Sequence, residues 1–338
     1  MTHHLSFGAR AAMAVLALPL LGAAAAAQVA PREPVRIVGP ATVFALTVAA
    51  GERFALQSGR EMPISEPLGT ETGLALFCAG NGAQHPDILS AERRLGRADL
   101  AACTRNGVGV SELTIGFQAV ALAQNPGAPP LSPTRRQVFL ALAREVPLDG
   151  RLVANPYRLW SDIDFALPVA PIEVLVPPPG SPLRQQFTEL VMEPAAAEFP
   201  ALRGRAAGAF RTDGAAVELA ADAETLRAEL ARRPQALAVI GFNELALAGG
   251  GLRAVPVDGV APTAAGLADG SYRPARPIHL YVKRAHADAV PGLKDYLAEI
   301  LGAVASGPGG YLTARGLVPL APAAAEAQRA AARSLPPL

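Results

Sequence analysis

Short apolar runs alternate with amphipathic helical segments through most of this chain, and no other feature of the sequence restricts its fold as strongly. Apolar runs long enough for a buried strand occur at residues 34–39, 113–124, 172–176, 236–242 and 278–283. Apolar side chains recur at helical spacing in 43–57, 134–145 and 291–304, and after Asp222, a preferred N-cap residue. Strands that alternate with helices in this way indicate an α/β protein.

The length of the chain indicates more than one lobe. A chain of 338 residues exceeds what a single hydrophobic core usually organises, so we expect two α/β lobes. Residues 321–338 are rich in alanine and proline, and we expect a loose C-terminal tail there.

The N-terminal segment has the pattern of a secretory signal peptide. A short basic stretch precedes the apolar run AAMAVLALPLL, and GAAAAA ends in an A-x-A cleavage pattern. We therefore expect residues 1–27 to be removed after Ala27 and the rest of the chain to be exported. The alternative is an N-terminal membrane anchor that stays in place.

Charge and motif content argue against several classes of function. The chain carries 30 basic and 29 acidic residues, a formal net charge of +1, so we expect no nucleic acid partner. The histidines after the signal segment, at positions 85, 279 and 286, are not at metal-ligand spacing with a cysteine or another histidine. Neither a G-x-S-x-G motif nor a glycine-rich dinucleotide loop occurs in a suitable context. We therefore expect no metal, no cofactor and no enzymatic activity.

Cys78 and Cys103 are the only two cysteines. In an exported chain, two cysteines are expected to form a disulfide. The bridge would close a loop of roughly 25 residues and contribute on the order of 3 kcal/mol in the chain-entropy model. The alternative is a pair of buried free thiols.

Three segments combine a strand, a small or hydroxyl residue and the start of a helix: 37–44, 66–78 and 174–187. Free N–H groups and the helix dipole at such starts favour a bound anion, although serine and threonine are also ordinary helix caps. Arg184, in the first turn of the third helix, has the wrong sign for the positive end of a helix dipole. Either it helps to hold an anion, or it is ordinary surface charge.

At these segments the sequence resembles the PstS-like phosphate-binding proteins of bacterial ABC transporters, a branch of the type II periplasmic binding proteins. The resemblance extends over nearly all of the chain after the signal segment. It is clearest in LFCAGNGAQHPDI (76–88), RLVANPYRLWSDIDFALPVAPIEVLVPPPGSPLRQQFTELVME (151–193), FRTDGAAVE (210–218), VDGVAPTAAGLADGSY (257–272) and GPGGYLTARGLVPL (307–320).

The resemblance implies a two-lobe fold with a crossover-strand hinge formed by 113–124 and 278–283. Lobe 1 would comprise 34–118 plus 284–320, and lobe 2 would comprise 119–283. A monomeric protein of this type would bind phosphate or a related oxyanion between its lobes, without a cofactor, in the periplasm. Closure of the lobes would present it to an ABC permease in the inner membrane.

The ligand-binding positions of the family can be carried over to matching residues of this chain. The family's Gly-Ser-Ser-Thr-Val segment is Gly-Pro-Ala-Thr-Val here, and its Thr-Ser-Gly-Thr-Arg-Asp segment is Gly-Ser-Pro-Leu-Arg-Gln. The implied site is Thr42, Val43, Thr70, Asp87, Ser181 and Arg184, with Arg211 and Asp213 as secondary candidates. Asp87 matches the aspartate that accepts the proton of hydrogen phosphate in the family.

Several matching positions have lost the family's donor groups. Substitutions at ligand positions are Pro40, Ala41, Glu71, Pro182 and Leu183, and the family's Asn-Ala-Ser-Arg is Ser-Ala-Glu-Arg at 90–93. Each donor lost from a buried anion costs about 1–3 kcal/mol. Two hypotheses therefore follow: a periplasmic oxyanion-binding protein that serves an ABC permease, or a descendant with a degenerate pocket that binds another ligand or a protein partner. The orientation of Glu71, into the cleft or away from it, is left open.

Overall fold

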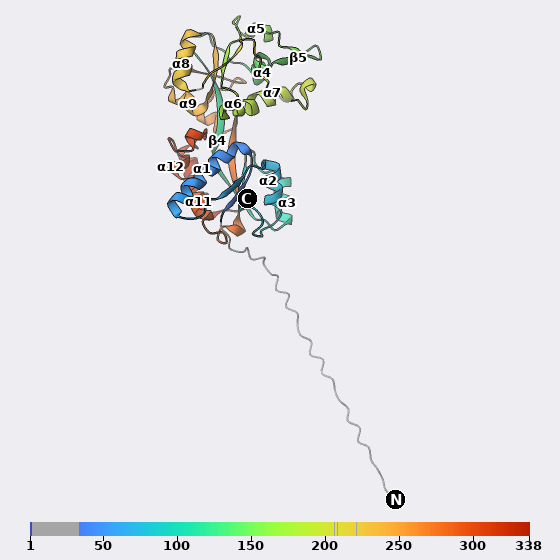
Figure 1. Ribbon diagram of the computed structural model, residues 1–338, viewed down its shortest axis with the longest axis vertical. Coiled ribbons are helices and arrows are strands. Elements are labelled where there is room, and N and C mark those ends of the chain that lie inside the picture. The colour runs from blue at the N-terminus through green and yellow to red at the C-terminus, as the bar shows by residue number, and fades with distance from the viewer. Residues whose placement is uncertain (2–33, 206, 208, 221) are drawn as a thin grey trace.

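The computed structural model describes Met1 and residues 34–338 except 206, 208 and 221. The signal peptide expected at 1–27, with its cleavage site after Ala27, lies outside the described residues. Two α/β lobes are stacked along the long axis of the molecule and joined by extended strands (Figure 1). The predicted two-lobe architecture is confirmed.

Lobe 1 contains a mixed sheet in the order β2-β1-β3-β11-β4. Its strands are β1 (Arg36–Val38), β2 (Ile64–Glu66), β3 (Ile88–Ala91), β4 (Val110–Gln124) and β11 (Ala275–Lys283). β1, β2 and β3 run parallel, whereas β11 runs antiparallel to β3 and β4. The three parallel strands place their carboxyl ends at one edge of the sheet.

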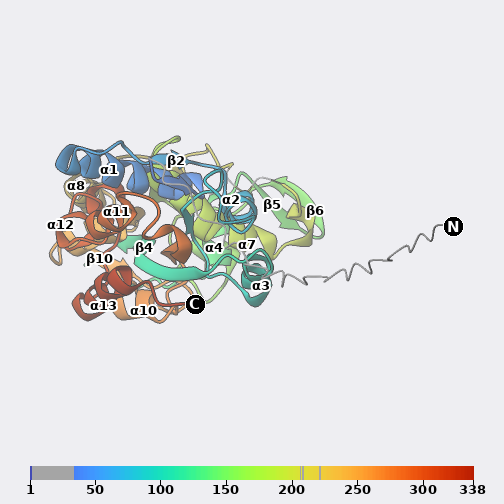
Figure 2. The same ribbon diagram turned by 90° about the horizontal axis from the view of Figure 1, so that it is seen from below.

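Helices cover both faces of the lobe 1 sheet. They are α1 (Ala41–Ser58), α2 (Thr70–Phe77), α3 (Arg97–Arg105), α11 (Leu293–Ile300), α12 (Ala303–Ser306) and α13 (Pro322–Ser334). Figure 2 shows α1 and α11 on one side and α2 and α3 on the other. The first pair meets in a core where the rings of Phe54 and Tyr296 pack edge to face, 6.0 Å between centroids. Phe77 of α2 and Leu89 of β3 pack in a separate core on the opposite face.

The expected disulfide is confirmed. Cys78, at the end of α2, is bonded to Cys103 in α3 across a sequence separation of 25 residues. Both cysteines are buried in the core beneath these helices, so the alternative of two free thiols is excluded.

Lobe 2 is built on the distal half of β4. Its sheet runs in the order β4-β9-β7-β8, with β10 paired to the other side of β4. These strands are β7 (Val174–Val176), β8 (Ala216–Glu218), β9 (Leu237–Gly241) and β10 (Arg253–Val255), and β5 (Glu145–Leu148) and β6 (Arg151–Ala154) form a separate hairpin. The helices are α4 (Arg135–Leu142), α5 (Trp160–Ile163), α6 (Pro182–Phe187), α7 (Glu193–Ala197), α8 (Ala223–Arg232), α9 (Phe242–Leu247) and α10 (Ala264–Ala268), with one π-helical turn at Thr188–Met192.

Apolar alternation along β4 serves two cores. Leu113 and Ile115 are buried in lobe 1, whereas Val120 and Leu122 are buried in lobe 2. β11 pairs along β4 and also with β3, and its residues Ile278, Leu280 and Val282 are buried in lobe 1. The sequence placed 119–283 in lobe 2, but the structure places 278–283 in lobe 1. The boundary therefore falls within β11, because its apolar face is covered by lobe 1 helices.

The C-terminal segment differs from the expected loose tail. α13 packs against lobe 1, where Ala332 and Leu335 are buried in the core. Gln328 accepts a hydrogen bond from the Thr114 N–H at 2.8 Å, and the Leu338 N–H donates to the Val110 carbonyl at 3.0 Å. These contacts along β4 hold the chain end in place.

Among the described residues, no helix combines the length and the apolar character needed to cross a membrane.

We predict that the C-terminal segment stabilises lobe 1. Replacement of Leu335, which is 4% exposed, by alanine removes buried apolar surface and should lower the free energy of unfolding by about 2–5 kcal/mol. Leu338→Ala, at a position 57% exposed, is the matched control and should leave stability nearly unchanged. Urea denaturation compares the two variants, and equal stabilities would contradict a packed chain end.

Candidate functional site

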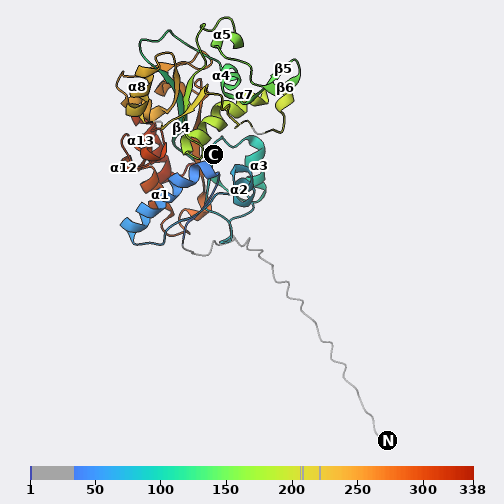
Figure 3. The same cartoon turned by 45° about the horizontal axis from the view of Figure 1, so that its top comes forward.

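The face between the lobes is lined by the chain segments that follow the parallel strands. α1 follows β1, α2 follows β2, and Glu92 directly follows β3. In lobe 2, α6 follows β7 and lies on the side that faces lobe 1, near the start of α1 (Figures 1 and 3). Ligands of open α/β sheets bind at the carboxyl ends of such strands.

Arg276 contacts both lobes on this face. One guanidinium nitrogen, Nη2, is 2.7 Å from Glu92 Oε1 of lobe 1 and 2.6 Å from Glu189 Oε2 of lobe 2. Its Nε donates to Gln118 Oε1 at 3.0 Å. Arg276 is directly opposite Gln118 in the β11–β4 ladder, so the guanidinium is held at the crossover strands and contacts both lobes.

Thr42 connects this arginine to the start of α1. Its hydroxyl donates a hydrogen bond to Glu92 Oε1, the oxygen that also contacts Arg276. The Thr42 carbonyl accepts a hydrogen bond of 3.0 Å from Gln118 Nε2. We call Thr42, Glu92, Gln118, Glu189 and Arg276 the interlobe cluster.

The environment of Glu92 disfavours its charged form. Burial is the main cause that raises the pKa of the Glu92 carboxyl, and the nearby Glu189 carboxylate raises it further. Arg276 and the Thr42 hydrogen bond lower the pKa but do not compensate fully. The carboxylate thus lies between two donors in a setting that favours proton uptake.

The start of α2 contributes Thr70, which is partly buried. The neighbouring Glu71 side chain is 74% exposed and bonded to Arg93 at 2.8 Å. Arg93 also binds Asp99 at 2.7 Å, and its hydrogen bonds are the main cause that lowers the pKa of Asp99. The Glu71 carboxylate is therefore tied to the α3 side of lobe 1 and is already paired.

Val43 and Asp87 have mainly internal partners. The Val43 side chain is fully buried in lobe 1, and its N–H donates to the Pro40 carbonyl at 3.2 Å. Asp87 is fully buried at the amino end of β3, where it accepts from the Arg36 N–H at 2.7 Å and contacts His286 Nδ1 at 2.5 Å. Because β3 separates Asp87 from Glu92, Asp87 is not brought to the interlobe cluster.

Ser181 and Arg184 stabilise their own loop. The Ser181 hydroxyl accepts from the Arg184 N–H at 3.3 Å and donates to the Pro178 carbonyl at 2.8 Å, so it caps α6. The Arg184 guanidinium donates to the Pro177 carbonyl at 2.7 Å and lies over the Phe210 ring, 3.5 Å from its centroid. Burial lowers the pKa of Arg184. These contacts explain why Arg184 lies in the first turn of α6 without requiring a bound anion.

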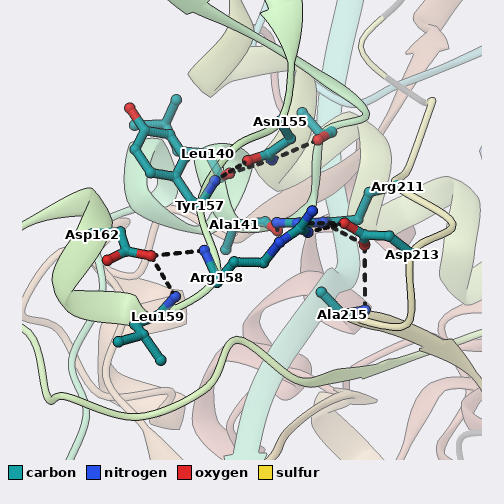
Figure 4. Close-up of polar contacts among 11 residues, drawn as sticks. Leu140, Ala141, Asn155, Tyr157, Arg158, Leu159, Asp162, Arg211, Asp213 and Ala215 are labelled. Atoms are coloured by element: carbon teal, nitrogen blue, oxygen red, sulfur yellow. Dashed lines mark hydrogen bonds and ion pairs between the residues drawn. The ribbon is translucent and has the colours of Figure 1, made fainter.

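Arg211 and Asp213 form an ion pair within lobe 2 (Figure 4). The buried Arg211 guanidinium donates to both carboxylate oxygens, at 2.8 and 2.6 Å, and to the Ala141 carbonyl at 3.2 Å. Arg158 makes a second ion pair with Asp213. The hydrogen bonds from Arg211 are the largest cause that holds the pKa of Asp213 well below its usual range. The pair fastens the 211–215 loop to α4.

Two hollows occur near these elements. One, of about 150 Å³ including its mouth, lies at the start of α1 and is lined by Gly39, Pro40, Phe44 and Ser90 among others. The second, of about 320 Å³ counted in the same way, lies in lobe 2 beside Trp160. No group of three or more metal-ligating side chains occurs within the described part of the chain.

A family model for the PBP superfamily domain matches residues 24–304. The chain belongs to the PBP superfamily. The SphX protein of Synechocystis sp. is 26% identical over 288 residues, covering 83% of this chain and 78% of SphX. The SphX protein of Synechococcus elongatus is 25% identical over 250 residues, covering 72% of this chain and 66% of SphX.

Solved structures share the fold of this chain. A possible phosphate binding protein from Planctomyces limnophilus superimposes with a TM-score of 0.67 at 19% identity, covering 90% of this chain and 99% of that protein. PstS from Borrelia burgdorferi gives a TM-score of 0.56 at 14% identity, covering 85% and 98%. At these identities the likeness establishes the fold, and membership of the PBP superfamily, which the sequence predicted, is confirmed by the family model.

Within the interlobe cluster of this PBP-superfamily chain, the sequence pointed to Thr42 as a site residue and to Glu92 only as part of the altered segment 90–93. It did not point to Gln118, Glu189 or Arg276. Gln118 and Arg276 lie on crossover strands, where apolar alternation alone does not reveal which polar side chains reach the interlobe face. Glu189 lies in a π-helical turn whose register helical periodicity does not describe.

We predict that Asp213→Asn destabilises lobe 2, because it leaves the buried Arg211 without its carboxylate. Solvent screens the exposed side of the pair, so we expect the free energy of unfolding to fall by only about 1–2 kcal/mol at neutral pH. Since folding lowers the pKa of Asp213, its stabilising effect is complete above the usual aspartate pKa of about 4 and is lost as the pH falls below it. The difference in Tm from the unsubstituted protein should therefore shrink between neutral pH and about pH 3.

Thermal unfolding followed by circular dichroism measures this difference. Asp288→Asn is the control, because its side chain is 88% exposed and its ion pair with Lys294 lies at the surface. A Tm difference for Asp213→Asn that does not change with pH would contradict the assigned role.

Proposed function

We propose that this protein is an exported solute-binding protein that captures phosphate or a related oxyanion between its lobes for an ABC permease. The observation that carries the proposal is that Thr42 and Arg276 already bind an anionic group, the Glu92 carboxylate, at the face between the lobes. The family, and the names of the similar proteins from Planctomyces limnophilus and Borrelia burgdorferi, support phosphate as the ligand class.

The proposed site combines one charge with several neutral donors. Arg276 supplies the cation, Thr42 and Thr70 supply hydroxyl groups, and the starts of α1 and α2 supply backbone N–H groups. An arginine at this position donates two hydrogen bonds in the planar geometry that oxyanions accept. We propose a binding role without catalysis, and the protein functions as a monomer in the periplasm.

Other residues suggested by the resemblance receive different roles in this proposal. Ser181 and Arg184 shape the loop that faces the site from lobe 2, and Val43 anchors the start of α1. Asp87, Arg211 and Asp213 hold the lobes internally.

A second candidate function is the binding of a different ligand or of a protein partner. It is favoured by the two carboxylates, Glu92 and Glu189, that already engage Arg276 and make the cluster net negative. A cationic or neutral ligand would suit such a face better than a dianion does.

Isothermal titration of the ligand-free protein with phosphate, arsenate and sulfate tests the proposal. We predict that Arg276→Gln weakens oxyanion binding by about tenfold or more, because the only charged donor of the proposed site is lost. Arg184→Ala should change the affinity by less than about threefold while lowering Tm, because its contacts are with Pro177 and Phe210.

Arg105→Gln, an exposed substitution on α3, is the control for loss of one positive charge. The absence of heat with all three anions would reject the oxyanion proposal and favour the second candidate. A large effect of Arg184→Ala together with no effect of Arg276→Gln would move the site to α6.

A further inference from the structure

Glu92 uses the donors that an oxyanion would need. Its Oε1 atom accepts from the Thr42 hydroxyl and contacts Arg276 Nη2. A threonine hydroxyl has one proton and donates one hydrogen bond at a time. An oxyanion and the ionised Glu92 carboxylate therefore cannot both be bound by Thr42.

Charge around Glu92 also opposes a second anion. Three groups face its carboxylate: Thr42 from α1, Arg276 from β11 and Glu189 from the π-helical turn of lobe 2. Two carboxylates against one guanidinium leave one excess negative charge. The neighbouring cation Arg93 does not offset it, because Arg93 is already paired with Glu71 and Asp99.

Both conflicts weaken when Glu92 gains a proton. A neutral carboxylic acid no longer forms an ion pair with Arg276, and it gains an O–H that can donate to a bound oxyanion. Its remaining acceptor oxygen is neutral and therefore competes less well than an oxyanion for the Thr42 hydroxyl. Burial of the Glu92 side chain, which is 19% exposed, works in the same direction because it penalises the charged form.

We infer that the Glu92 carboxylate is a built-in competitor of the solute, and that oxyanion binding is coupled to proton uptake by Glu92. This inference rests on the proposed function. This role is the opposite of that of a carboxylate that accepts a hydrogen bond from the ligand. Such a carboxylate must stay ionised to bind a protonated ligand, whereas Glu92, as a competitor, must be neutralised before the ligand binds. Affinity then increases as the pH falls.

The substitution Glu92→Gln separates the two roles. An amide keeps the size of the side chain, removes its charge and cannot take up a proton. If Glu92 competes, the variant should bind phosphate about tenfold more tightly than the unsubstituted protein at mildly alkaline pH, and the difference in affinity should shrink as the pH falls. If Glu92 is an acceptor, the variant should bind phosphate more weakly.

Phosphate itself titrates near neutral pH, so the number of protons taken up is measured as well. Calorimetry in two buffers of different ionisation enthalpy gives that number, and the difference between the two proteins removes the contribution of the ligand. We expect the unsubstituted protein to take up more protons than Glu92→Gln, by an amount that approaches one per anion bound. Glu52→Gln, an exposed position on α1, is the matched control and should behave as the unsubstituted protein.

The outcomes distinguish this inference from the proposed function. Weaker binding by Glu92→Gln, or equal proton uptake by both proteins, overturns the inference and leaves the oxyanion proposal standing. No binding by any of the three proteins at any pH overturns both. Should Glu92→Gln fail to fold, proton uptake by the unsubstituted protein compared with Glu92→Asp keeps the test decisive, because a shorter carboxylate reaches Thr42 less well and should compete less.

Discussion

The antiparallel pairing of β4 and β11 is the interaction on which the rest of the structure depends. β4 contributes to the sheets of both lobes, and β11 is paired with it along its whole length, from Ala275 to Lys283. Gly116 lies where the ladder passes from one lobe to the other, and a Cβ there would come within 2.5 Å of the Val318 carbonyl. A side chain would push the returning chain away, so the crossover requires glycine at this position. The lobes are thereby linked through backbone that is fixed by packing rather than by a free linker.

This arrangement explains why the interlobe cluster forms at the crossover. Gln118 and Arg276 are direct partners in the ladder, so their positions are set by the hinge itself and not by either lobe. Glu92 and Glu189 come from opposite lobes and meet at the same guanidinium nitrogen. A change in the angle between the lobes must therefore alter at least one of these two contacts. The contacts of Arg276 thus depend on the relative position of the lobes.

The sequence predicted features that depend on local patterns or on a single pair of residues. It did not predict features that depend on packing between distant parts of the chain. Apolar periodicity located β1, β4, β7, β9 and β11 and the longer helices, but it missed the short strands such as β2 and β3. With only two cysteines in the chain, there was little choice of disulfide partner. We expected a loose tail after residue 321 because a segment rich in alanine and proline shows little apolar periodicity. Leu335 is nevertheless buried in the core of lobe 1, among residues that are distant in sequence. Asp87 and Glu92 are five positions apart but lie at opposite ends of β3, and only the fold reveals which end faces lobe 2. Arg184 illustrates the same limit, since Phe210 is distant in sequence.

The start of α1 gives the competition at Glu92 its physical basis. α1 has no acidic residue in its first turn, and its N-cap, Pro40, provides no side-chain hydrogen bond, so the positive end of the helix dipole is uncompensated by its own segment. Glu92 supplies the missing anion from another element. A solute that displaces it exchanges one anion for another at the same donors, and most of the attraction cancels between the two states. What remains is the difference in charge and in hydrogen-bonding capacity between a carboxylate and the incoming oxyanion. Selectivity would then be governed by the internal carboxylate as much as by the donors that both anions share.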